Sequence, residues 1–300
     1  MPSGKALIRD IDDFTPAPGE FALWWLGQHG FVLKLGVHVI YIDAFLSDMD
    51  SRQVPPLLKP AEVANADLIL GTHDHGDHID RDAWPAMAAA SPQARFVVPE
   101  LLRRKVAEEL KLPPERVVGV DDMQTVEVQG SAEVRSSASH SAEVRSTTSH
   151  VPGVRITGVA AAHEFLDRDV ATGQYPYLGY VVEAGGATIY HSGDCCTYEG
   201  LQTKLKRWTF DLVLLPINGR DAVRLAAGCI GNMTYQEAAD LAGALEPRRT
   251  IPAHYDMFAV NAADPKLFVD YMRVKYPRLQ TSVCEHGVRV VLPAGGGVRS

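Results

Sequence analysis

The sequence lacks any uninterrupted apolar run of about eighteen residues, so no membrane-spanning helix is expected. It is also poor in cysteine, with 4 in 300 residues, two of which, Cys195 and Cys196, are adjacent. That number and spacing do not predict a disulfide framework. Residues 1–10 lack the apolar core of a signal peptide. We therefore expect a cytoplasmic protein without a membrane segment.

Positive charge is scarce as well. The chain has 29 Lys and Arg residues against 37 Asp and Glu, which gives a net charge of −8. This balance argues against a general binder of nucleic acid or of anionic membranes, although it allows a local cationic site. Hydrophobic residues make up 46% and charged residues 22%, as is typical of soluble globular proteins. We expect a single domain over residues 1–300, with a homo-oligomer left open.

Four candidate metal ligands lie within six positions. An apolar segment, residues 68–70, predicts a short buried strand and is followed by His73, His75, Asp77 and His78. Residues two apart in an extended loop point the same way, whereas adjacent residues diverge. The spacing therefore favours two ions, one bound by His73 and His75 and the other by Asp77 and His78. Imidazole and carboxylate suit Zn²⁺, with Mn²⁺ and Fe²⁺ as further candidates, and a solvated polar turn is the alternative.

The succession of an apolar strand and a candidate ligand recurs later in the chain. Strands predicted at residues 154–160, 187–191 and 249–253 are followed by His163, Asp194 and His254. Strands of one sheet edge could thereby deliver their ligands to a single rim. For His163 and His254 taken singly, a satisfied buried histidine is a fair rival interpretation.

The remaining pattern is that of an α/β chain. Residues 1–20 are polar and are expected to form an irregular lead-in. Segments 21–26, 31–35 and 37–42 predict an antiparallel meander with tight glycine connections. Helices are expected over residues 80–90, 99–110 and 264–275, and another behind a capping box formed by Thr234 and Glu237.

Asp43 ends the third strand of the meander. A carboxylate there can hold a metal-bound histidine in place, or it can cap the next turn, and the sequence favours neither. His38 lies within the strand and is interpreted as a strand-face residue. His29 lies in a turn and its role stays open.

Residues 131–150 contain a duplication in which eight of ten positions repeat. The segment is rich in Ser, Thr and Ala and has little to bury, so we predict an exposed, mobile insertion. Removing it would join residues 128–130 to residues 153–156 as a hairpin. His140 and His150 are not expected to bind metal, because a mobile insertion does not preorganise a site.

The motif His-x-His-x-Asp-His after an apolar strand resembles the signature of the metallo-β-lactamase superfamily. Further blocks are similar to the L-ascorbate-6-phosphate lactonase branch of that superfamily, namely residues 17–27, 72–80, 191–194, 233–238 and 251–254. The resemblance covers about residues 17 to 292, and the insertion and the block around His163 depart from it. It implies a four-layer αβ/βα sandwich with a metal site at the sheet edge.

The resemblance also implies a ligand set and a reaction. One metal would have His73, His75 and His163, the other would have Asp77, His78 and His254, and Asp194 would bridge them. The two ions, Zn²⁺ or Mn²⁺, would share a hydroxide that attacks the carbonyl of a sugar-phosphate lactone. Asp77 would be the catalytic carboxylate that orients the nucleophile or passes its proton on.

A small phosphorylated substrate requires a cation, and a loop after the strand predicted at 211–215 offers one. Arg220 and Arg224 could bind the phosphate, with neutral donors from Asn218 and Asn232. Alternatively, Arg220 pairs with Asp221 or another acid and fixes the loop. Cys195 and Cys196 either pack behind the site or provide a reactive thiol.

Two other functions stay open. One is a phosphodiesterase or ribonuclease on the same fold, although the acidic balance argues against a large RNA substrate. The other is a non-catalytic metal-binding protein, which a complete ligand set disfavours. The oxygen-reducing di-iron branch is disfavoured because it usually carries Glu at the position of His75.

Overall fold

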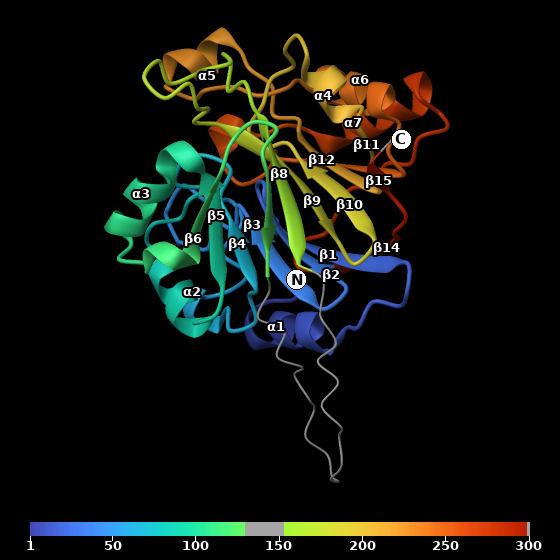
Figure 1. The fold of residues 1–300 in the computed structure, drawn as a ribbon. Coiled ribbons are helices and arrows are strands. Elements are labelled where there is room, and N and C mark those ends of the chain that lie inside the picture. Colours follow the sequence, from blue (N-terminus) through green and yellow to red (C-terminus); the bar gives the residue numbers. More distant parts are fainter. Residues whose placement is uncertain (130–152, 299–300) are drawn as a thin grey trace.

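The computed structural model describes residues 1–129 and 153–298, which form two mixed β-sheets packed face to face (Figure 1). The first sheet is antiparallel from its first to its fourth strand and parallel from there on. In spatial order its strands are β14 (Arg289–Pro293), β1 (Glu20–Gly27), β2 (Gly30–Leu35), β3 (His38–Ile42), β4 (Leu68–Leu70), β5 (Arg95–Pro99) and β6 (Val117–Val120).

The second sheet repeats this mixture of directions. Its first three strands are parallel and the rest are antiparallel. In spatial order they are β13 (Arg249–Ala253), β12 (Leu212–Pro216), β10 (Ala187–His191), β9 (Leu178–Ala184), β8 (Val154–Ala160) and β7 (Thr125–Val128). A small separate ribbon pairs β11 (Trp208–Thr209) with β15 (Gly297–Val298).

Helices cover the outer faces of both sheets (Figure 1). The first sheet is covered by α1 (Gly4–Asp13), α2 (Trp84–Ala90) and α3 (Glu100–Glu109), and the second by α4 (Leu201–Leu205), α6 (Tyr235–Leu245) and α7 (Pro265–Lys275). Short elements complete the described chain, namely α5 (Ala222–Ala226) and the 3₁₀ turns η1 (Pro60–Glu62), η2 (Pro114–Arg116) and η3 (Ala259–Asn261).

Strand β1 shows why the sandwich has four layers. Leu23 and Trp25 belong to the core between the sheets, whereas Trp24 and Leu26 pack in the core beneath α1, α2 and α3. Because side chains alternate between the two faces of a strand, a strand that is apolar at every position must be covered on both sides. The expected α/β sandwich is therefore confirmed.

Several expectations for single elements are confirmed. The meander pairs in antiparallel register, and Thr234 and Glu237 form the capping box of α6. Asp264 caps α7, as expected. The helix expected over residues 80–90 is present but begins at Trp84, because Asp80 accepts the Ala83 backbone N–H in a turn before it.

The expectation of an irregular lead-in over residues 1–20 was wrong. Residues 4–13 form α1, whose Leu7 and Ile11 are fully buried one turn apart. The helix is fixed to the first sheet because the Trp24 indole N–H donates to Asp10 (2.8 Å) and the Lys34 ammonium donates to the backbone oxygen of Ile11 (2.5 Å). A cation at the last turn also complements the helix dipole.

Strands β7 and β8 pair in antiparallel register with Val128 opposite Val154, as the predicted hairpin requires. The duplicated segment 131–150, with His140 and His150, lies outside the described residues. Within residues 1–129 and 153–298, no helix has the length and apolar character that a bilayer crossing requires.

Candidate metal centre

The loop that follows β4 carries three histidines and an aspartate to the edge of the sandwich. Loops after β8, β10 and β13 bring His163, Asp194 and His254 to the same edge. The described residues form four groups in which one potential ligand atom of each residue lies within 4.8 Å of the others, and two of these groups contain His29. The other two lie side by side in the loops named above. The first is His73, His75 and His163, and the second is Asp77, His78 and His254.

The first group consists of imidazoles only. The Nε2 atom of His73 lies 3.0 Å from Nδ1 of His75, and the ring of His163 lies 5.2 Å from that of His73. Burial lowers the pKa of all three histidines, that of His73 well below its usual value. Neutral imidazoles keep the lone pair that a metal ion requires.

The second group combines two imidazoles with a carboxylate. Nε2 of His78 and Nε2 of His254 lie 3.6 and 3.7 Å from the same oxygen of Asp77. Although burial opposes it, the neighbouring carboxylates raise the pKa of both histidines, Asp194 contributing most. The carboxylates around this group therefore favour a positive charge at it, whether a proton or a metal ion.

Asp194 lies between the two groups. One of its oxygens is 3.4 Å from Nε2 of His78, and the other is 3.1 Å from Nε2 of His254 and 3.8 Å from Nε2 of His163. Burial by itself would raise the pKa of Asp194, but His254 and His78 hold it well below its usual value. The residue thus presents a carboxylate to both groups at once.

Asp43 holds His78 from behind. Its carboxylate lies 2.7 Å from Nδ1 of His78 and also accepts the backbone N–H and the hydroxyl of Thr72, at 2.9 and 2.7 Å. A proton on Nδ1 of His78 leaves the lone pair on Nε2, which faces the group. Of the two roles that the sequence left open for Asp43, the contact with His78 is the one observed.

The chemistry of the donors fits a divalent metal ion. Nε2 of His78 is buried and makes no hydrogen bond to the described residues, although Asp194 lies 3.4 Å away. A buried polar atom without a partner is costly, so such atoms usually belong to a site that something else completes. The buried His and Asp groups are consistent with metal binding, with donors typical of Zn²⁺, Mn²⁺ or Fe²⁺.

Gln28, in the turn between β1 and β2, was not anticipated as part of this site. Its side-chain amide donates to Asp77 (3.0 Å) and lies 3.1 Å from Nε2 of His254, and its backbone oxygen accepts the His254 N–H. The amide therefore joins two residues of the second group. The Trp-Leu-Gly-Gln-His sequence of the turn carried no ligand spacing that could have indicated it.

His29 and His191 form a buried layer beneath the centre. Nδ1 of His29 lies 3.4 Å from Asp194, and Nε2 of His191 lies 2.9 Å from the backbone oxygen of His29. Burial lowers the pKa of His29 to about 4 and that of His191 to about 3. Both rings are therefore neutral at neutral pH. His29 makes the polar contact with Asp194, and His191 packs against His29 behind it.

The backbone is strained where it enters the centre. Gln28, Asp43 and His254 have φ angles of 53°, 47° and 59°, a region that residues with a side chain seldom adopt. Each such position costs on the order of 1–3 kcal/mol and persists where the surrounding structure fixes it. Their concentration at one edge of the sandwich is typical of a functional site.

The four residues predicted to bind a phosphate lie beside the centre but are engaged with the protein. Both terminal nitrogens of Arg220 donate to Glu237, at 2.7 and 2.8 Å. Arg224 donates to the backbone oxygens of Asn218 and Ala262. Asn232 donates to the side chain of Asn218 (3.2 Å). The pair with Glu237 matches the alternative in which Arg220 pairs with an acid other than Asp221 and fixes the loop.

The two adjacent cysteines are buried. The Cys195 thiol donates to the backbone oxygen of Cys196, and burial raises the pKa of Cys195 to about 12. Burial also raises the pKa of Cys196. Since the thiolate is the reactive form, the raised pKa values of both cysteines favour a packing role.

Comparison with known proteins gives a consistent result. A family model described as a beta-lactamase superfamily domain matches residues 38–255. A UPF0173 metal-dependent hydrolase from Thermococcus kodakarensis is 31% identical over 245 residues, which cover 81% of this chain and 88% of that protein.

Two solved structures share the fold. Igni18, a metallo hydrolase from the archaeon Ignicoccus hospitalis, superimposes with a TM-score of 0.62 at 20% identity, covering 91% of this chain and 98% of that one. An isothiocyanate hydrolase from Delia radicum gut bacteria has a TM-score of 0.65 at 14% identity, covering 91% and 100%. Identities this low indicate a common fold and do not transfer a substrate.

Proposed function

We propose that this chain, which belongs to the metallo-β-lactamase superfamily and to its UPF0173 metal-dependent hydrolases, hydrolyses an ester bond, with a lactone as the substrate expected from the sequence. The observation that supports the proposal is the pair of His and Asp groups that meet at Asp194. Two neighbouring groups of this composition are typical of a two-metal hydrolytic site.

In this proposal His73, His75 and His163 hold one divalent ion and Asp77, His78 and His254 hold the other, with Asp194 between them. When bound, such ions polarise a carbonyl oxygen and lower the pKa of coordinated water toward about 7. The ions would be Zn²⁺ or Mn²⁺, with Fe²⁺ as a further candidate.

Asp77 is the proposed catalytic residue. Its side chain is 21% exposed, whereas the neighbouring imidazoles of His78 and His254 are almost completely buried. Although burial opposes it, His78 and His254 lower the pKa of Asp77, so the group is a carboxylate that can accept a hydrogen bond from a nucleophile and orient it. The Gln28 amide donates to one of its oxygens, which fixes the orientation of the carboxylate toward the open side.

The phosphorylated lactone expected from the sequence stays a prediction. Arg220 and Arg224, the two cations assigned to the phosphate, make the contacts with Glu237 and the backbone described above.

The test combines metal analysis with a substrate panel. The purified chain is analysed for bound elements, stripped with a chelator and restored with Zn²⁺, Mn²⁺ or Fe²⁺, and each form is assayed on lactones, phosphodiesters and β-lactams. We expect stoichiometric metal, loss of lactone hydrolysis on stripping, and joint loss of metal and activity in His75→Ala and Asp194→Ala.

His38→Gln serves as the control, because His38 lies on β3 outside both groups. Full turnover by the stripped chain would contradict the two-metal proposal. Metal retention without hydrolysis of any substrate in the panel would instead favour a metal-binding protein without catalysis.

A further inference from the structure

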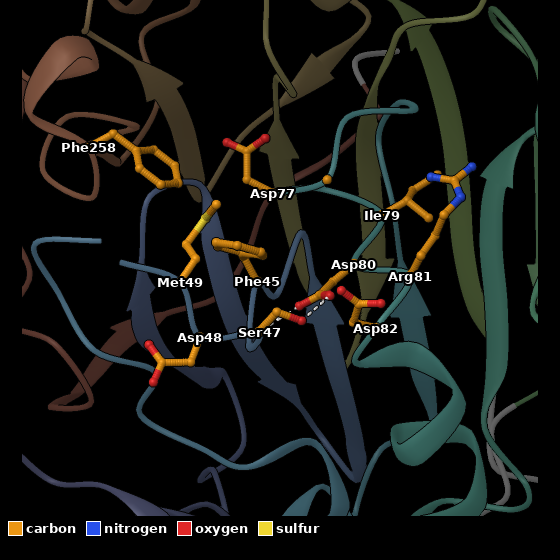
Figure 2. Close-up of a pocket in the computed structure, with 11 residues that line it drawn as sticks. Phe45, Ser47, Asp48, Met49, Asp77, Ile79, Asp80, Arg81, Asp82 and Phe258 are labelled. Atoms are coloured by element: carbon orange, nitrogen blue, oxygen red, sulfur yellow. Dashed lines mark hydrogen bonds between the residues drawn. The ribbon is translucent and has the colours of Figure 1, made fainter. Parts of the chain in front are cut away.

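A cavity of about 440 Å³ opens beside the candidate metal centre (Figure 2). Gly76 and Asp77 of the metal-binding loop form the part of its wall that borders the centre. A side-chain carbon placed on Gly76 would meet no atom within 4 Å, so the cavity is open at this point. A group bound there would lie next to the proposed catalytic carboxylate.

Apolar side chains form much of the wall. Phe45, Met49 and Ile79 line the cavity together with Phe258, which reaches it from the loop after β13 (Figure 2). The rings of Phe45 and Phe258 are 6.2 Å apart at their centroids and are tilted by 44°. Met49 is 48% exposed and has a flexible, polarisable side chain that adapts to different apolar partners.

Polar contacts fix this wall in place. The Arg52 guanidinium donates to the backbone oxygens of Phe45 (3.1 Å) and Ser47 (2.7 Å) and lies 4.7 Å from the Phe45 ring centroid. The Asp80 carboxylate accepts the backbone N–H and the hydroxyl of Ser47. A backbone bridge joins Arg52 to Phe258, so the loops that carry the two rings are held together.

The charges around the cavity are mainly negative. Asp48 and Asp82 are exposed at its wall, and neither makes an ion pair with another described residue. Arg81 is the cation among the lining residues, and its guanidinium is engaged by Asp74 (2.5 Å) and Glu109 (2.8 Å). Away from Asp77, where the proposed metal ions would add positive charge, an anionic group in the cavity would therefore face carboxylates without a free cation from the described lining.

We infer that this cavity, hereafter the Phe45 pocket, binds an apolar, uncharged group of the substrate next to the bond that is cleaved. The inference rests on the proposed hydrolytic function and specifies its substrate class. Apolar area removed from water between Phe45, Met49 and Phe258 provides the affinity. Asp48 and Asp82 provide selectivity, because a like charge near them disfavours an anionic group.

Two matched dyes test the binding class on the full-length, metal-loaded protein. N-phenyl-1-naphthylamine is neutral, and 8-anilinonaphthalene-1-sulfonate is the same ring system with one negative charge. Fluorescence titration should show that the neutral dye binds at least about tenfold more tightly, as expected for repulsion between like charges at partly exposed sites. Equal binding of the two dyes would overturn the inference.

Variants locate the binding site. Phe258→Ala should weaken binding of the neutral dye by about tenfold or more, because it removes one aromatic wall. The double variant Asp48→Asn/Asp82→Asn should strengthen binding of the sulfonate alone. The double variant Glu108→Gln/Glu115→Gln, which removes two carboxylates outside the pocket, should leave both affinities unchanged.

Competition connects the pocket to catalysis. The neutral dye should inhibit hydrolysis of 4-nitrophenyl acetate competitively, and the inhibition should be lost in Phe258→Ala. Dye binding in the pocket without competition would overturn the assignment to the substrate. Dye selectivity without any ester hydrolysis by the metal-loaded chain would contradict the proposed function and would leave the binding class of the pocket supported.

Discussion

The Asp43→Asn variant tests whether the centre depends on a residue that would not itself bind metal. The Asp43 carboxylate is fully buried and accepts from Thr72 while it holds Nδ1 of His78. Asparagine has nearly the same shape and tolerates the positive φ angle of 47° at this position. The variant therefore removes one negative charge with little change in packing.

The expected effect follows from the tautomer of His78. An amide NH₂ group that faces Nδ1 favours the tautomer whose proton is on Nε2, and a protonated Nε2 cannot bind metal. Loss of a partner that orients a metal-binding histidine typically lowers metal affinity by about 10- to 100-fold, or roughly 1.4–2.7 kcal/mol. The effect should concern the ion held by Asp77, His78 and His254.

Zn²⁺ affinity is measured by competition with a chromophoric chelator at constant pH, together with thermal unfolding of the metal-free protein. Asp67→Asn is the matched control, because Asp67 is also buried and accepts a backbone N–H, that of Val39, at the other end of β3. Unchanged Zn²⁺ affinity in Asp43→Asn, or an equal loss in Asp67→Asn, would refute the reasoning.

Other predictions concern the loop and the helices around the site. Arg220→Ala should lower the free energy of unfolding by about 0.5–1 kcal/mol, as expected for a partly exposed ion pair, and should affect kcat/KM equally for phosphorylated and unphosphorylated lactones; a selective loss on the former would show that Arg220 binds phosphate. Because Arg220 lowers the pKa of Glu237, the pair stabilises the fold above about pH 4.5, and this stabilisation is lost as the pH falls through the folded-state pKa. The difference in urea midpoint between the wild-type protein and Glu237→Gln should therefore shrink in acid. Gly243→Ala should cost about 1–3 kcal/mol in thermal or urea unfolding, because its new carbon would lie 2.2 Å from the ring of Tyr276, whereas Gly297→Ala, which meets no atom, should cost almost nothing.

The parts of the fold and the centre that could be predicted are those encoded locally. A short apolar strand followed by His73, His75, Asp77 and His78 indicates both a buried strand and a ligand-bearing loop, because strand length and ligand spacing are properties of consecutive residues. His163, Asp194 and His254 could be predicted as ligands for the same reason, because each follows an apolar strand in the sequence. Their meeting at one edge required only that the strands share a direction at that edge.

The parts that could not be predicted depend on contacts between distant segments. Gln28 reaches Asp77, 49 residues away, and His254, 226 residues away, and no spacing in the sequence indicates either contact. Arg220 finds its acid in Glu237, on the first turn of a helix, rather than in the adjacent Asp221. The position of a side chain at the end of a loop is decided by tertiary packing, which local sequence does not record.

The N-terminal helix was missed although a local signal was present. Leu7 and Ile11 are four residues apart and lie on one face of α1, but polar residues around them and the prolines at positions 16 and 18 favoured an irregular segment. The helix is stabilised by burial of these two side chains and by two contacts with the sheet, in which Trp24 donates to Asp10 and Lys34 donates to the backbone oxygen of Ile11. Tertiary packing rather than intrinsic propensity therefore determines it.

The register of β7 and β8 makes the end of the hairpin that they form a suitable insertion site for protein engineering. The chain leaves the sheet after Val128 and returns at Val154, directly opposite, where paired Cα atoms are about 5 Å apart. Since β8 runs from Val154 toward His163, this insertion site lies at the end of the strand that is farther from the metal centre. Closing a longer flexible connection costs only about 0.6 kcal/mol for each doubling of its length. A fluorescent reporter or an affinity peptide spliced between Gln129 and Gly153 should therefore report on the enzyme without disturbing its chemistry.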